Sequence, residues 1–158
     1  MAPIAGSSYR ATLPAVSLLL RWLHVLAAIT WIGGMLFIAL VLVPVTRRIP
    51  DPTLRVKLVQ DTGRRFRTVG WIAVAVLVVT GLLTLWIHPW LLSSPRLQWK
   101  LGLVALALIL SAIHDFVLGP KAGAPGADSA ARVRASWLAR VNVLVVLVIV
   151  ALGLSLFR

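Results

Sequence analysis

The chain has 158 residues, of which 60% are hydrophobic and only 13% charged, and its mean hydropathy is +0.98. A soluble domain uses about a quarter of its residues for charge, so this composition excludes an ordinary soluble protein. The chain has no cysteine, which excludes disulfides, thiolate metal sites and lipid attachment through a thiol.

Four apolar stretches are long enough to cross a hydrocarbon core of about 30 Å, which takes about 20 helical residues. They cover approximately residues 14–45, 68–90, 97–118 and 137–157. Their continuous apolar runs lack the alternation of barrel strands, so helices are expected. The sequence therefore predicts an all-α integral membrane protein, a four-helix transmembrane bundle that forms a single membrane domain over residues 1–158.

The first stretch carries a histidine, His24. No basic segment precedes this stretch, which is also longer than the apolar region of a signal peptide, so we expect it to be retained as a helix. His24 shares a helix face with Ala27 and Ala28. Small residues around a histidine either let helices pack closely or leave a slot for a flat macrocycle that the histidine ligates. Arg21, on the same face, either reaches lipid headgroups or pairs with a propionate.

The second stretch ends at His88, just before Pro89 and Trp90. A histidine in this place either lies in the polar interface or binds a ligand. At 1.5 Å per residue, His24 and His88 both lie roughly 12 to 14 Å outward of their helix midpoints, so they can face each other across one cofactor. Before this stretch, residues 47–67 form a basic connection that we expect to hold a short interfacial helix.

The third stretch contains His114 and Asp115, which point about 100° apart around a helix. His114 lies about 7 Å from the midpoint of its helix, toward the cytoplasmic end. It is a candidate metal or haem ligand, because neutral imidazole suits iron, copper and zinc. We expect Asp115 to meet Arg140 or Asn142 near the start of the fourth helix, in an ion pair or as a proton relay. The brief loop before this stretch makes the second and third helices antiparallel neighbours.

The net charge of +12 is distributed unevenly over the loops. Seven basic residues follow the first stretch, and four more lie before or at the start of the fourth, where we expect residues 119–131 to form a flexible linker. The positive-inside rule puts these two connections in the cytoplasm and both termini on the outer side of the inner membrane. Topology thus explains the charge, and nucleic-acid binding is not expected.

Eight short motifs are distributed along the chain, and each alone is weak evidence of a family. They are residues 21–28 (RWLHVLAA), 31–34 (WIGG), 64–66 (RRF), 80–81 (TG), 99–101 (WKL), 114–116 (HDF), 119–120 (GP) and 138–142 (LARVN). Together they resemble the copper resistance D (CopD) family of membrane proteins and, more distantly, the HemJ type of protoporphyrinogen oxidase. The resemblance implies a four-helix inner-membrane protein linked to copper. In the HemJ branch it implies a b-type haem protein with histidines that match His24 and His114.

The depth estimate and the family resemblance pair different histidines as ligands: the first pairs His24 with His88, and the second pairs His24 with His114. The depth estimates separate His24 from His114 by roughly 19 Å, which is too far for one haem. An outer His24/His88 site and an inner His114 site reconcile them. The first helix also has Gly33–Phe37 where the HemJ pattern has arginine and tyrosine, so protoporphyrinogen oxidation is not the preferred activity.

The preferred hypothesis from the sequence is a b-type haem protein that carries out electron transfer or redox chemistry in the membrane. Its haem b would be held by His24, His88 and His114, with Arg21 nearby. Its partners would be lipid and either quinol or a periplasmic electron carrier, and so small a bundle is a candidate homodimer. Whether it is an oxidoreductase enzyme stays open.

Copper handling is the alternative function. The three histidines would then form stepping sites for copper through a permease. Met35 is the one internal methionine, so a histidine copper site is expected rather than a chain of thioether sites. A third hypothesis is a scaffold whose histidines hydrogen-bond between helices.

Overall fold

The computed structural model describes residues 6–124 and 126–155, with side chains from 15 to 124 and from 126 to 154. Regular structure in these residues is entirely helical. Four helical segments are long and apolar enough to span a membrane: Ala15–Thr46, Pro52–Ile87, Pro95–Gly123 and Ser129–Leu154. The protein is therefore an all-α, multi-pass membrane bundle, as predicted.

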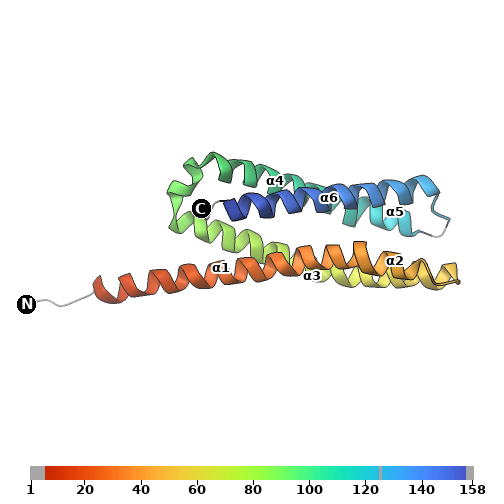
Figure 1. Ribbon diagram of the computed structural model, residues 1–158, viewed down its shortest axis with the longest axis horizontal. Helices are drawn as coiled ribbons and strands as arrows, with labels where there is room; N and C mark the ends of the chain where they lie inside the picture. Colours follow the sequence, from red (N-terminus) through yellow and green to blue (C-terminus); the bar gives the residue numbers. More distant parts are fainter. Residues whose placement is uncertain (1–5, 125, 156–158) are drawn as a thin grey trace, which may run out of the picture.

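The helices follow one another in alternating direction. The first span consists of α1 (Gly6–Phe37), the π-helical turn η1 (Ile38–Leu42) and α2 (Val43–Thr46), and the second is α3 (Pro52–Ile87). The short turn η2 (Pro89–Ser93) leads to α4 (Pro95–Ile113), the π-helical turn η3 (His114–Leu118) and α5 (Gly119–Gly123), and α6 (Ser129–Ser155) is last. The start of α1, η2 and the end of α6 lie at one end of the bundle, on the left of Figure 1.

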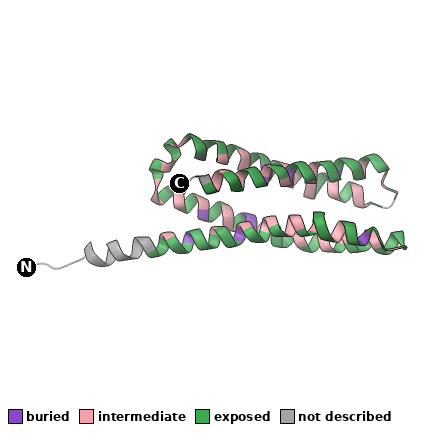
Figure 2. Ribbon diagram, in the orientation of Figure 1, coloured by how far each residue is buried: buried purple, intermediate pink, exposed green. Residues whose placement is uncertain are grey.

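The bundle consists of two antiparallel helix pairs. α1 packs mainly along α3, and α4 packs mainly along α6, so that Figure 1 shows one pair above the other. The short η2 connection makes α3 and α4 antiparallel, as expected, but the expectation that they are packing neighbours is wrong, because α3 packs mainly along α1 and α4 mainly along α6. Most of the described residues are exposed or only partly buried (Figure 2), and many of the exposed ones are large and apolar, such as Leu40 at 70% and Ile72 at 62% exposure. Such a surface is suited to contact with lipid chains.

Small residues fill the contacts between helices. Ala27, Ala73 and Ala107 are buried, which allows the helix backbones to approach closely. The tightest approach is between α1 and α3, where the ring of Phe66 occupies the space that a Cβ on Gly34 would need. This contact fixes the distance between the two helices that carry His24 and His88.

Helix α3 begins well before the apolar stretch that the sequence predicted at residue 68. The expectation of a separate interfacial helix within residues 47–67 is wrong, because residues 52–67 continue the membrane helix itself. The start is defined by Pro52 in the first helical position and by Asp51, whose carboxylate accepts the Thr53 N–H at 2.8 Å. Its basic residues therefore lie on a helical extension of the span.

Helix α6 also begins early, at Ser129 rather than at residue 137. The Asp128 carboxylate accepts the Ala131 N–H at 2.6 Å and so stabilises this start. The expected linker over residues 119–131 is consequently reduced to residues 124–128. The expected end of the fourth helix at residue 157 lies outside the described residues.

Two prolines inside the spans are accommodated without ending a helix. Pro44 and Pro120 each come two residues after a π-helical turn. In η3 the backbone N–H of Gly119 donates to the carbonyl of His114, five residues back. Because proline lacks an N–H and its ring collides with the carbonyl four residues earlier, the wider turn relieves the conflict. The third helix therefore continues past Pro120 to Gly123.

Candidate functional site

A line of polar side chains runs between α1 and α3. We call it the outer polar seam, and it comprises Ser17, Arg21, His24, Thr80, Thr84 and His88. The three members on each helix are spaced three or four residues apart and so share one face. The two faces meet in antiparallel register, with His24 opposite Thr80 and Ser17 near His88. The seam therefore brings both outer histidines to one helix interface.

His24 is held by a hydrogen bond that also fixes its tautomer. Its Nδ1 lies 2.8 Å from Oγ1 of Thr80, a residue that is only 3% exposed. The Thr80 hydroxyl donates its own hydrogen bond to the Val76 carbonyl at 2.7 Å, so its oxygen accepts a hydrogen bond from the Nδ1–H of His24. Nδ1–H of the neutral ring is thus engaged, and Nε2 keeps a lone pair. Gly81 packs against the ring, since a Cβ at this position would lie 3.8 Å from Cε1 of His24.

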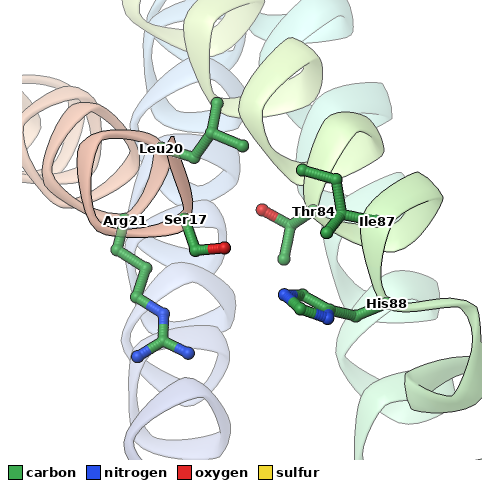
Figure 3. A pocket seen from close by; sticks show the side chains of 6 residues that line it. All are labelled: Ser17, Leu20, Arg21, Thr84, Ile87 and His88. Carbon is green, nitrogen blue, oxygen red and sulfur yellow. The ribbon is translucent and has the colours of Figure 1, made fainter. Parts of the chain in front are cut away.

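Nearer the η2 end, the seam encloses a small cavity of about 10 Å³ (Figure 3). Ser17 and Arg21 line it from α1, and Thr84 and His88 line it from α3. The His88 ring points into the space between the helices, and its Nδ1 is buried without a hydrogen-bond partner in the described part of the chain. Trp90 contacts the ring edge-on, with the ring centroids 4.8 Å apart. The structure thus brings Arg21 and His88 together, while His24 bonds further along the seam.

Lys100 is a further residue near the seam, which in the sequence stands out only as part of the 99–101 motif. It is half-buried on α4, and its ammonium is close enough to act electrostatically on His24. Its Nζ lies 3.4 Å from the position that a Cβ on Gly153 of α6 would take. The spacing of Lys100 along the chain gives no sign of this proximity, which depends on how the two helix pairs dock.

Asp115 does not meet the partners expected from the sequence. Its Oδ2 accepts the indole N–H of Trp71 at 2.9 Å, and its backbone carbonyl accepts Nη1 of Arg67 at 2.9 Å. Both partners come from α3, so the prediction of a contact with Arg140 or Asn142 is wrong. Trp71 thus directs its N–H into the bundle.

His114 lies apart from the other histidines, at the first position of η3. Its Nδ1 is buried without a hydrogen-bond partner among the residues that the structure describes. In the same residues, no group of three or more His, Asp or Glu side chains is arranged to hold a metal ion.

The described residues do not fit a haem. Two cavities among them, one beside His88 and one beside Trp71, have about 10 Å³ and about 20 Å³, which is room for a water molecule or a bare ion. The His24 ring is hydrogen-bonded to Thr80 and lies beside Gly81, and it borders neither of these two cavities. The haem b hypothesis, with its iron and oxidoreductase chemistry, therefore gains no support.

The fold and the seam define a class, a multi-pass membrane protein with imidazoles placed between its helices. A family model described as "Copper resistance protein D" matches residues 60–156, which include His88 and His114. An uncharacterized protein of Aquifex aeolicus (strain VF5) is 33% identical over 142 residues, covering 87% of this chain and 93% of that protein. No solved structure gives a significant match. The chain belongs to the copper resistance protein D family.

Proposed function

We propose that this protein is a copper-handling permease of the inner membrane, in which His24, His88 and His114 are successive sites for the ion. The observation that carries the proposal is the hydrogen bond between His24 and Thr80. It engages Nδ1 and leaves Nε2 as a free ligand inside the bundle, which is the arrangement that second-shell partners give to metal-binding histidines. The family's name supports copper as the ion.

The other two histidines supply the same chemistry. Nδ1 of His88 and Nδ1 of His114 are both buried, and neither has a hydrogen-bond partner within the described residues. Imidazole suits copper, and the chain offers it no thiolate. Single imidazoles spread along a bundle hold an ion weakly, and a transport path needs sites that release their ion as well as bind it.

Positive charge beside the seam supports weak retention too. Arg21 lines the outer cavity, and the Lys100 ammonium acts on His24. A cation at His24 is repelled by these charges, so its residence is shortened. This electrostatic setting is suited to passage of copper rather than to storage.

The direction of the seam follows from the distribution of basic residues. The positive-inside rule assigns the connections at residues 47–51 and 124–128, with the helical ends beside them, to the cytoplasm. The seam then opens toward the outer side, where both termini are placed, and His114 lies in the cytoplasmic half. Copper would meet His88 and His24 before His114.

The proposal predicts a metal-binding protein without haem. Purified protein in mild detergent should show no Soret band, before or after dithionite and after incubation with haemin, and in equilibrium dialysis against copper(I) it should bind the ion with weak affinity. The measurements are the absorption spectrum and the metal content. A Soret band that shifts on reduction and disappears in His24→Ala or His88→Ala would overturn the proposal in favour of a haem protein.

A further inference from the structure

The first turns of α6 present a basic and aromatic face on the surface of the bundle. Arg134, Trp137 and Arg140 are all exposed, and residues three apart are neighbours on a helix, so the two arginines flank the ring. Side chains lean toward the start of their helix, and the Arg140 guanidinium accordingly lies over the Trp137 ring, 5.5 Å from its centroid. Within the described residues neither arginine forms an ion pair. Two guanidinium groups beside one indole are therefore open to a ligand.

An aromatic layer at the same level resembles the boundary of a hydrocarbon core. The side-chain hydrogen bond from Asn142 to Ser111, at 2.8 Å, sets the register of α6 against the third span. Five residues from this bond, toward the same end of the bundle, lie Trp137 on α6 and Phe116 in η3. The Phe116 ring is in turn 5.6 Å from the ring of Trp71 on α3. The three rings thus lie at about one depth, as aromatic residues do at a membrane–water interface.

An exposed apolar stripe continues from Trp137 along the same face of α6. It consists of Val141, Leu144 and Val148, which follow at intervals of three or four residues and are all exposed. At 1.5 Å per residue the stripe reaches about 16 Å beyond Trp137, which is close to half of a hydrocarbon core of about 30 Å. An acyl chain along this stripe would span one leaflet, with its headgroup beside the arginines.

Positive charge is concentrated at this level of the bundle. Within about two helical turns of the aromatic layer, α3, the third span and α6 carry one acidic residue, Asp115, and seven basic residues. The basic residues are Arg64, Arg65, Arg67, Lys121, Arg132, Arg134 and Arg140. Such an excess attracts lipids whose headgroups have a net negative charge more strongly than zwitterionic ones.

We propose that this face of α6 binds one anionic phospholipid, with its phosphate between Arg134 and Arg140 and an acyl chain along the apolar stripe. Arginine suits this role because its planar guanidinium donates two parallel hydrogen bonds to a phosphate. The cation–π contact with Trp137 holds Arg140 in place at the headgroup level. The site uses no residue of the outer polar seam and does not depend on copper.

Native mass spectrometry of the purified protein in mild detergent tests the site. The probes are phosphatidylglycerol and phosphatidylcholine with the same acyl chains, since both have a phosphate but only the first has a net negative charge. Wild type should bind one phosphatidylglycerol at least about tenfold more tightly than phosphatidylcholine. Arg134→Gln and Arg140→Gln should each lower the affinity for phosphatidylglycerol about fivefold, the usual contribution of one basic residue, and leave phosphatidylcholine unchanged.

Two further variants serve as controls. Arg140→Lys keeps the positive charge and should retain more of the affinity than Arg140→Gln does. Arg96→Gln removes an exposed arginine at the start of α4, at the opposite end of the bundle, and should change the binding of neither lipid. All of these positions are exposed, so the variants should fold.

Three results would overturn the proposal. The first is equal binding of the two lipids by wild type, and the second is an equal loss of phosphatidylglycerol in Arg96→Gln and Arg140→Gln. The third is a dimer that disappears in Arg140→Gln, because it would assign this face of α6 to a second copy of the chain.

Discussion

His24→Ala is expected to lower the affinity of the purified protein for silver(I), a redox-inert substitute for copper(I), by at least about tenfold. The alanine removes the imidazole whose Nε2 is free and leaves Thr80 with its hydroxyl still bonded to the Val76 carbonyl. The fold should persist, since the His24 side chain is only half-buried and its polar contacts are confined to one stretch of α3, at Leu77 and Thr80. Isothermal titration in detergent measures the effect.

Two matched changes at Thr80 and one at Lys100 make this result specific. Thr80→Val removes the acceptor that orients the ring and should weaken binding less than His24→Ala does, while Thr80→Ser should keep it. Lys100→Met removes the neighbouring positive charge and should tighten binding at His24. If His24→Ala binds silver(I) as wild type does, the seam is not a metal site.

Gly34→Val is expected to destabilise the bundle by about 1 to 3 kcal/mol, the usual cost of overfilling a packed contact. The added side chain would occupy the space of the Phe66 ring and force α1 away from α3. Because the same helix pair holds His24 against Thr80, the variant should also lose silver(I) affinity. Denaturant titration in detergent reports the free energy of unfolding.

The neighbouring glycine provides the control for helix propensity. A Cβ on Gly33 would have nothing within 4 Å, so Gly33→Val should leave stability nearly unchanged. Phe66→Leu combined with Gly34→Val should recover part of the loss, because the smaller side chain vacates the contested space. Equal destabilisation by Gly33→Val and Gly34→Val would show that the Phe66 contact is not the cause.

Hydropathy predicts four spans because lipid demands long apolar helices, but it does not predict where the helices begin. The starts of α3 and α6 are set by the aspartates Asp51 and Asp128 in polar sequence, outside the apolar stretches. From hydropathy alone, the charged residues that follow these two aspartates are predicted to be loop. In the structure they form the first turns of α3 and α6, outside the apolar stretches. Hydropathy also does not predict that the third helix continues beyond Pro120 to Gly123, since a π-helical turn leaves no hydropathy signal.

The residues of the candidate site can be predicted from the sequence, but which of their side chains contact each other cannot. His24, His88, His114 and Arg21 stand out because polar groups are rare in the spans. Thr80 is not distinctive in sequence, and its role depends on the antiparallel register of α1 and α3. The partner of Asp115 was wrongly predicted because Trp71 has two possible roles, interface anchor and hydrogen-bond donor. The haem hypothesis arose because small residues near a histidine fit a slot and close packing equally well, and here they pack closely.

The most direct test of a copper permease is uptake by liposomes that contain the purified protein and an encapsulated copper(I) indicator dye. Wild type should admit external copper(I) faster than protein-free liposomes do, and His24→Ala should reduce the rate to that of the protein-free liposomes. Wild-type liposomes that take up copper(I) no faster than protein-free ones would contradict the proposed function.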